Sequence, residues 1–428
     1  MNLVEYKNIG EEVWHEKLYN GLNIFVIPKR GFNRTYAFFA VNYGGCDRRF
    51  MLDGKWHDTP AGVAHFLEHK MFDMPEGNAL TMLSENGASP NAFTGNGITG
   101  YLFRCTDKFE EDLALLLKFV TTPYFTAESV AKEQGIIGQE IKMGEDDPDR
   151  RVHTNLMKAL YGHHPVRDSI AGTVESIAEI TPEVLYTCHK AFYTPSNMVL
   201  CVSGNVDPET VRRVALENAR SASNEVTQRD YGGDDGVLPA RIRYEEFMSI
   251  SAPVFMFGAK LPYENDGRLF LKKLLAGELA CEMLMGESSE LYAEMYRDGI
   301  INPTFYCGTS DFPGGAFVTA GGESRQPYEI LDRVISEAEK LGQSGGEELF
   351  ERLKKAMLGS TIRSLDSVES ICHNEAEAFF HGYSSFEARD ILLGVTIDDA
   401  RAFMREYFVI ERMAMSIIRP LEEKQKGV

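Results

Sequence analysis

The sequence predicts an α+β protein made of two similar halves, each a mostly antiparallel sheet covered by helices. The chain has 428 residues, which suits two or three domains better than one. Its hydrophobic content of 43% and aromatic content of 11% are typical of a globular protein that can build two cores. A faint internal repeat relates Ala61–His65 to Ala276–Ala280, and the surroundings of Gly138 to those of Gly359. Together these observations predict a duplicated domain.

A change in composition separates the two halves. Between residues 221 and 240 the chain becomes rich in small and polar residues, including the run Gly232-Gly-Asp-Asp-Gly236 and then Pro239. Stretches of this composition are typical of linkers. We therefore expect a first domain over residues 1–220, a linker over 221–240 and a second domain over 241–428.

Strand patterns open the first half. The segment Leu18–Pro28 contains a turn at Asn20-Gly21, a dipeptide that favours tight hairpins. The segment Thr35–Tyr43 alternates in polarity and is rich in aromatic residues, as expected of a sheet strand. These two segments predict the start of a sheet.

A short helix with two histidines follows. The string is His65-Phe-Leu-Glu-His69, and Thr59 and Pro60 offer a cap and a first helical residue before it. On a helix, residues four apart share a face, so both imidazoles can reach one metal ion. Glu68 lies on nearly the same face and can act as a general base. The alternative is two surface histidines on an amphipathic helix.

A second helix adds two carboxylates. Glu133 and Glu140 are seven residues apart, which is two helical turns and therefore one face. The neighbouring Ile136, Ile137 and Ile141 predict a partly buried helix, where a carboxylate is costly unless it is paired or bound to a metal. The alternative is an ordinary solvated face of a helix.

The other segments of the chain alternate between strand and helix patterns. The predicted strands cover residues 88–94, 100–105, 197–204 and parts of 241–261. The predicted helices cover residues 77–87, 110–120, 151–161 and 208–218.

Charge and cysteine content restrict the partners and the compartment. The net charge of −20 argues against binding to nucleic acid or to anionic membrane surfaces. No apolar run is long enough to span a membrane, and the first residues lack a signal-peptide pattern. The seven cysteines include no Cys-x-x-Cys pair, so we expect reduced thiols in a cytoplasmic protein.

These motifs together resemble the pitrilysin (insulinase) type of inverse-zincin metallopeptidases. The resemblance rests on His65-Phe-Leu-Glu-His69 and on the Glu133/Glu140 pair. It extends to Ser89-Pro-Asn-Ala-Phe-Thr94 and to Gly172-Thr-Val-Glu-Ser-Ile177, and it covers most of the chain. Within the family, the chain looks most like the two-domain, mitochondrial-processing-peptidase-like bacterial branch.

The resemblance implies a role for each residue of the predicted site. His65, His69 and Glu140 become the ligands of Zn²⁺, and Glu68 becomes the general base. Glu133 becomes an outer carboxylate that orients a ligand. The strand with Asn91, Ala92 and Phe93 becomes the sheet edge on which an extended peptide adds as a further strand; the alternative is an ordinary edge strand.

The resemblance also implies that the two halves face each other across a peptide-binding chamber. In the second half the repeat retains the helical pattern but loses the chemical groups. His65, Glu68 and His69 correspond there to Ala280, Met283 and Leu284. Glu133 and Glu140 correspond to Lys354 and Thr361. We therefore expect a second domain without metal ligands.

The second half also departs from the family pattern. Members of the family usually supply an Arg and, seven residues later, a Tyr that stabilise the developing oxyanion. Here Arg297 plus seven is Thr304, and the nearest tyrosine is Tyr306, beyond Pro303. A related partner subunit that supplies this pair is one explanation. The other is that Arg297 and Tyr306 reach the site through an altered loop.

The sequence therefore leads to one main hypothesis and two rivals. The main hypothesis is a zinc endopeptidase for peptides or short unfolded segments, acting as the catalytic subunit of a heterodimer. The first rival is a peptide-binding or scaffolding subunit that does not cleave. The second is a self-sufficient processing protease that forms a homodimer.

Overall fold

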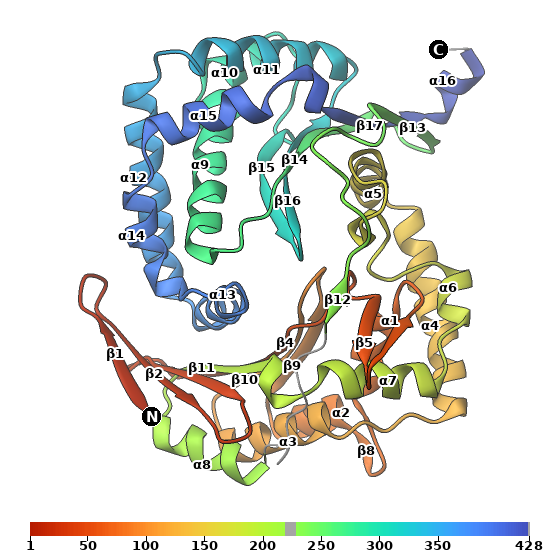
Figure 1. Cartoon of the computed structure of the whole chain (residues 1–428), viewed down its shortest axis with the longest axis vertical. Helices are drawn as coiled ribbons and strands as arrows, with labels where there is room; N and C mark the ends of the chain where they lie inside the picture. Colours follow the sequence, from red (N-terminus) through yellow and green to blue (C-terminus); the bar gives the residue numbers. More distant parts are fainter. Residues whose placement is uncertain (219–227, 427–428) are drawn as a thin grey trace. The chain divides into compact units, whose positions relative to one another are not determined.

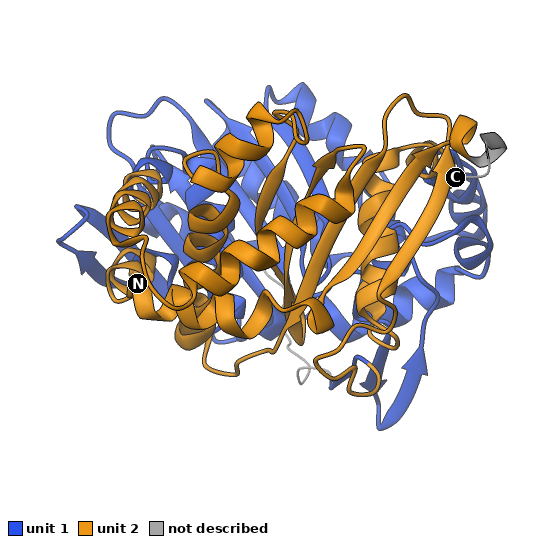
Figure 2. Ribbon diagram, turned by 90° about the horizontal axis from the view of Figure 1, so that it is seen from above, with its two compact units in different colours: residues 1–141, 169–231, 362–386 blue, residues 142–168, 232–361, 387–428 orange. Residues whose placement is uncertain are grey.

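The computed structural model describes residues 1–218 and 228–426. The chain forms two compact units, coloured separately in Figure 2. Unit 1 contains residues 1–141, 169–231 and 362–386, and unit 2 contains residues 142–168, 232–361 and 387–428. Each unit is a sheet covered by helices, as the sequence predicts.

The sheet of unit 1 has seven strands in the order β1-β2-β3-β11-β4-β10-β9 (Figure 1). Only β3 and β11 are parallel, and the turn at Gly21 between β2 and β3 lies where the sequence predicts it. The strands are β1 (Asn2–Tyr6), β2 (Glu11–Lys17), β3 (Asn23–Pro28), β4 (Thr35–Val41), β9 (Ser89–Thr94), β10 (Thr99–Cys105) and β11 (Met198–Gly204).

Helices cover both faces of this sheet because successive side chains of a strand point to opposite faces. In β4, Ala37 and Phe39 join the core beneath α1 (Val63–Met71), α3 (Phe109–Thr121) and α7 (Pro182–Phe192). Phe38 and Ala40 join a second core beneath α13 (Val368–Phe380). Figure 1 shows α13 on one side of this sheet and α3 on the other. Unit 1 is completed by α2 (Ala79–Glu85), most of α4 (Ala127–Glu145), α6 (Val174–Ala178), α8 (Pro208–Asn218), and the short strands β5 (Arg49–Leu52), β6 (Lys55–Asp58), β7 (Asp73–Met74), β8 (Gly77–Asn78) and β12 (Arg229–Asp230).

The sheet of unit 2 repeats the topology of unit 1. Its strand order is β13-β17-β14-β16-β15, with β13 and β17 parallel, which matches β3-β11-β4-β10-β9 strand for strand. This match confirms the predicted duplication. The elements are β13 (Arg243–Met248), β14 (Val254–Leu261), β15 (Tyr306–Phe312), β16 (Gly315–Glu323), β17 (Ala414–Pro420), α5 (Pro148–Leu160), α9 (Gly267–Met285), α10 (Glu290–Arg297), α11 (Pro327–Leu341), α12 (Glu347–Ser364), α14 (Ala388–Leu393), α15 (Ile397–Tyr407) and α16 (Leu421–Lys426).

The two units exchange one helix each, so they depart from the predicted domain boundaries. Helix α5 comes from the first half of the chain but lies against β13, β14 and β17 of unit 2. Helix α13 comes from the second half but lies against β4 and β11 of unit 1. A boundary near residue 220 separates these helices from the sheets whose apolar faces they cover.

The part of the predicted linker that the structure describes, residues 228–240, forms hydrogen bonds and an ion pair with both units. Residues 221–227 lie outside the described part of the chain. In unit 1, Tyr231 donates a hydrogen bond to the buried Asp47 at 2.9 Å, and Arg229 pairs with the same carboxylate at 3.3 Å. In unit 2, Asp235 accepts hydrogen bonds from the backbone N–H groups of residues 162–164. Within residues 1–218 and 228–426, no helix combines the length and apolar composition that crossing a bilayer requires.

Candidate metal centre

Helix α1 presents both histidines of the motif. It begins at Val63, after Gly62 in the left-handed conformation with φ of +96°, so the predicted start at Thr59 and Pro60 is wrong. A Cβ atom at Gly62 would lie 2.6 Å from the carbonyl oxygen of Ala171. Glycine is therefore required both by the backbone conformation and by this close packing.

Helix α4 brings the carboxylates to the same place because both helices bury apolar residues in one core. Val63 and Leu67 of α1 share this core with Ile137 and Ile141 of α4. Ile136 is 49% exposed, so the expectation that it helps to bury the helix is wrong. The Glu140 side chain is left partly exposed beside the histidines.

The three predicted ligands converge. Nε2 of His65 lies 3.6 Å from Oε1 of Glu140, and Nε2 of His69 lies 3.8 Å from Oε2 of Glu140. One ligand atom from each of the three residues can be chosen so that all lie within 4.8 Å of one another. Among the described residues, this is the only group of three or more His, Cys, Asp or Glu side chains with such spacing.

Glu68 lies beside this group and is almost completely buried, with 8% of its surface exposed. Its Oε2 accepts a hydrogen bond of 2.6 Å from the hydroxyl of Thr94, at the end of β9. Burial raises the pKa of Glu68, while the Thr94 hydrogen bond and the charge of His69 oppose the rise without cancelling it. Thr94 is the last residue of the motif Ser89–Thr94 but was not among the predicted site residues.

Glu133 holds His69 from the side away from the ligand nitrogen. Oε1 of Glu133 lies 3.1 Å from Nδ1 of His69. A carboxylate at this position fixes the proton on Nδ1 and leaves the lone pair on Nε2. The hydrogen bond with His69 holds the pKa of Glu133 below its usual value, against the opposing effect of burial. Lys70, which was not among the predicted site residues either, lies beside the other oxygen of this carboxylate, with Nζ 3.6 Å from Oε2.

The strand with the predicted substrate contacts is an edge of the sheet. β9 pairs with β10 and has no second neighbour among the described strands. Asn91 is exposed, and Ala92 packs against the core that contains α1. The ring of Phe93 stacks on Phe38 and His373, with centroids 5.8 and 5.3 Å apart. Phe93 therefore offers its backbone at the edge, while its ring is covered by α13.

Arg297 and Tyr306 belong to unit 2, whereas the three predicted ligands belong to unit 1. Arg297 is the last residue of α10 and is exposed. Tyr306 is the first residue of β15 and is 48% exposed. Between them, Asn302 accepts hydrogen bonds from the backbone and the hydroxyl of Thr304, so a compact turn occupies the segment where the family's Tyr is expected.

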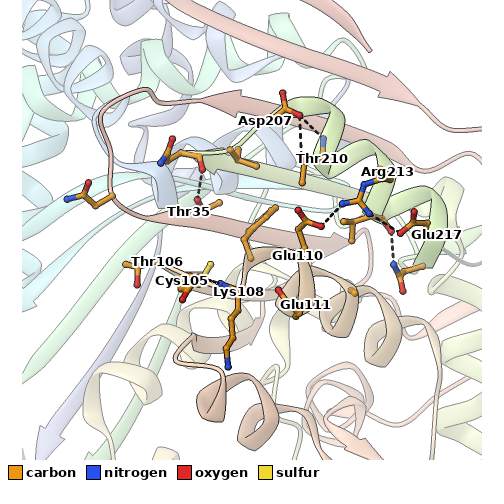
Figure 3. Close-up of a pocket in the computed structure, with 18 residues that line it drawn as sticks. Thr35, Cys105, Thr106, Lys108, Glu110, Glu111, Asp207, Thr210, Arg213 and Glu217 are labelled. Carbon is orange, nitrogen blue, oxygen red and sulfur yellow. Dashed lines mark hydrogen bonds and ion pairs between the residues drawn. The ribbon is translucent and has the colours of Figure 1, made fainter.

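A separate pocket of about 780 Å³ lies in unit 1 and contains none of the predicted site residues (Figure 3). Some of its polar side chains contact one another. Arg213 pairs with Glu110 and Glu217, and Asp207 accepts hydrogen bonds from Thr210 at the start of α8. This pocket is a groove beside α3 and α8, it is lined by none of the residues of the metal group, and we assign it no role.

Comparison with known proteins places the chain in a family. The family model "Insulinase (Peptidase family M16)" matches residues 53–174, and the model "Peptidase M16 inactive domain" matches residues 179–357. A protein of Bacillus subtilis strain 168, named "Uncharacterized zinc protease YmfH", is 36% identical over 425 residues. That alignment covers 97% of this chain and 99% of the relative. The chain belongs to the M16 (insulinase) family of peptidases.

Solved structures agree with this M16 assignment. An M16-like peptidase from Alicyclobacillus acidocaldarius superposes with a TM-score of 0.92 at 33% identity, covering 97% of this chain and 99% of that one. A protease from Helicobacter pylori has the same fold, with a TM-score of 0.80 at 16% identity, covering 96% of this chain and all of its own. His65, His69 and Glu140 all lie in the segment that matches the insulinase model. The segment that matches the inactive-domain model contains α9, which carries Ala280 and Leu284, the residues that the repeat predicts in place of the two histidines.

Proposed function

We propose that this M16-family chain is a zinc-dependent endopeptidase that cleaves peptides or short unfolded segments. The observation that carries the proposal is the convergence of His65, His69 and Glu140 beside a buried carboxylate, Glu68. Two imidazoles and one carboxylate are a ligand set typical of catalytic zinc, with a fourth position left for water or substrate. Tetrahedral zinc requires ligand atoms about 3.3 Å apart. The distances of 3.6 Å from His65 to Oε1 of Glu140 and 3.8 Å from His69 to Oε2 of Glu140 are near this value, and one ligand atom from each residue lies within 4.8 Å of the others.

The residues around the group have complementary tasks in the proposed reaction. Zinc, when bound, would polarise the substrate carbonyl and lower the pKa of a water molecule. Glu68 would take the proton from that water and later deliver it to the leaving amine. Because Thr94 donates to Oε2 of Glu68, Oε1 is the atom that we expect to receive this proton.

The edge strand β9 supports an extended peptide as the substrate. A peptide that pairs with the backbone of Asn91, Ala92 and Phe93 would lie next to Thr94, the hydrogen-bond partner of Glu68. Pairing through the backbone depends little on side chains. We therefore expect the enzyme to accept varied sequences, provided that the segment is unfolded.

We further propose that a related subunit supplies the Arg and Tyr that stabilise the oxyanion. The spacing of Arg297 and Tyr306 differs from the family pattern, and a turn at Asn302 lies between them; both observations support a second subunit that supplies the pair.

The alternative is a peptide-binding or scaffolding subunit that does not cleave. It is supported by the match of residues 179–357 to the model of an inactive domain. Against that rival, binding alone requires no buried general base beside the metal group. The homodimeric processing protease remains the third candidate.

The experiment that tests the proposal is cleavage of a diverse peptide mixture by the zinc-loaded chain, read by mass spectrometry. Glu68→Gln is the matched control because it retains the shape of the side chain but cannot accept the proton. We expect cleavage that depends on Glu68, either by the chain alone or after a related subunit with the Arg/Tyr pair is added. Peptide binding without cleavage under both conditions would reject the endopeptidase in favour of the scaffolding role.

A further inference from the structure

Lys70 is a buried lysine beside the predicted ligand His69. Its side chain is only 2% exposed, which is rare for lysine because a buried ammonium is costly unless it is paired. Two carboxylates pair with it: Asp73, in direct contact, and Glu133, whose Oε2 lies 3.6 Å from Nζ. These two pairings explain how a lysine side chain can be buried inside unit 1.

The two oxygens of Glu133 have different partners. Oε1 lies 3.1 Å from Nδ1 of His69, and Oε2 is the oxygen that faces Lys70. A carboxylate that is held at both oxygens cannot rotate freely about its last bond. The position of the Lys70 ammonium thus determines how Glu133 presents Oε1 to His69.

We propose that Lys70 is a positioning residue of the metal centre, and that it acts on His69 through Glu133. Asp73 also pairs with this ammonium, which gives a continuous series Asp73, Lys70, Glu133, His69. The inference rests on the proposed function only in that His65, His69 and Glu140 bind zinc. Outer residues that orient a metal ligand typically change metal affinity roughly 10-fold to 100-fold when they are replaced.

A double-mutant cycle tests this inference. The variants are Lys70→Met, Glu133→Gln and the two combined, and the zinc Kd is measured by competition with a chelating dye. We expect Lys70→Met to weaken zinc binding roughly tenfold in the native chain. In the Glu133→Gln background we expect almost no further loss, because the residue through which Lys70 acts is already altered. The visible absorption of the cobalt-loaded chain provides a second readout, because it reports the geometry at His69.

Two further variants complete the design. Lys118→Met is the matched control, because Lys118 also pairs with a glutamate, Glu76, but is 55% exposed. We expect its zinc Kd to equal that of the native chain. Lys70→Gln, which is uncharged and one atom shorter but still carries a hydrogen-bond donor, replaces Lys70→Met if the latter does not fold. A native Kd in the Lys70 variant that folds, or an undiminished loss in the Glu133→Gln background, would show that Lys70 is only a structural ion pair.

The outcome separates this inference from the proposed function. Zinc affinity is measured without substrate. A chain that depends on Lys70 for zinc but cleaves no peptide, either alone or with a related subunit that has the Arg/Tyr pair, would therefore reject the endopeptidase and leave the positioning role standing.

Discussion

At the residue scale, the hydrogen bond between Thr94 and Glu68 links the sheet edge to the predicted base. The bond is 2.6 Å long and holds one of the two oxygens of a carboxylate that is 8% exposed. Hydrogen bonds to charged groups are stronger than those between neutral groups. In the proposed reaction, neighbouring residues of β9 would therefore position both the substrate strand and the base Glu68.

The first prediction concerns this hydroxyl. Thr94→Val preserves the shape of the side chain but removes the donor, so Glu68 becomes less well oriented for proton transfer. We expect kcat to fall roughly tenfold, equivalent to about 1.4 kcal/mol in the activation barrier, while the zinc content stays unchanged. Thr94→Ser retains the donor and should remain close to the native rate. A native kcat for Thr94→Val, measured on a peptide that the native chain cleaves, would contradict this role.

At the element scale, the start of α1 depends on one glycine. Gly62 adopts φ of +96°, and the neighbouring segment around Ala171 leaves no room for a Cβ atom. The helix that presents His65 and His69 therefore begins where two segments of unit 1 meet.

The second prediction distinguishes the two reasons for a glycine at position 62, which are its positive φ and the lack of room for a Cβ atom. Gly62→Ala introduces both backbone strain and a clash with a backbone oxygen at 2.6 Å, so we expect a loss of about 2 to 4 kcal/mol in the free energy of unfolding. Gly31→Ala is the control, because Gly31 has φ of +92° with nothing within 4 Å of the added Cβ. It should lose only about 1 kcal/mol, from strain alone. Equal midpoints of urea unfolding for the two variants would show that packing at Gly62 is unimportant.

At the scale of the whole molecule, the exchange of α5 and α13 makes each unit depend on both halves of the chain. In unit 1, α13 contributes Val368, Ile371 and Cys372 to the core that covers one face of the sheet. Without this helix, Phe25 and Phe38 of that face would be exposed to water, which is unfavourable by about 25 cal/mol for each Å² of apolar surface.

The third prediction follows from this exchange. A fragment of residues 1–231 lacks α13, and a fragment of residues 232–428 lacks α5, so neither contains a complete unit. We expect each fragment alone to aggregate or to remain partly unfolded. When they are expressed together, they should copurify as one complex that binds zinc, as measured by size-exclusion chromatography and metal analysis. A folded, monomeric fragment 1–231 would contradict the structural role of α13.

Local periodicity explains how much of this protein can be read from its sequence. The i, i+4 spacing of His65 and His69, the two-turn spacing of Glu133 and Glu140, and the alternation in β4 are properties of short backbone segments. The internal repeat predicted the duplication because the apolar pattern persists where the ligands are lost. The metallopeptidase family followed from the combined motifs.

Other features depend on packing between segments that are far apart in the sequence. The start of α1 at Val63 depends on Ala171, which is far away in the sequence, and the covered ring of Phe93 depends on α13 from the other half of the chain. The pairing of Lys70 with Glu133 requires that α1 and α4 share one core. Most helices and strands, and the residue types that they present, can be predicted from the sequence because they reflect local preferences. Which faces meet follows from tertiary packing, because it depends on the apolar surface of the whole chain.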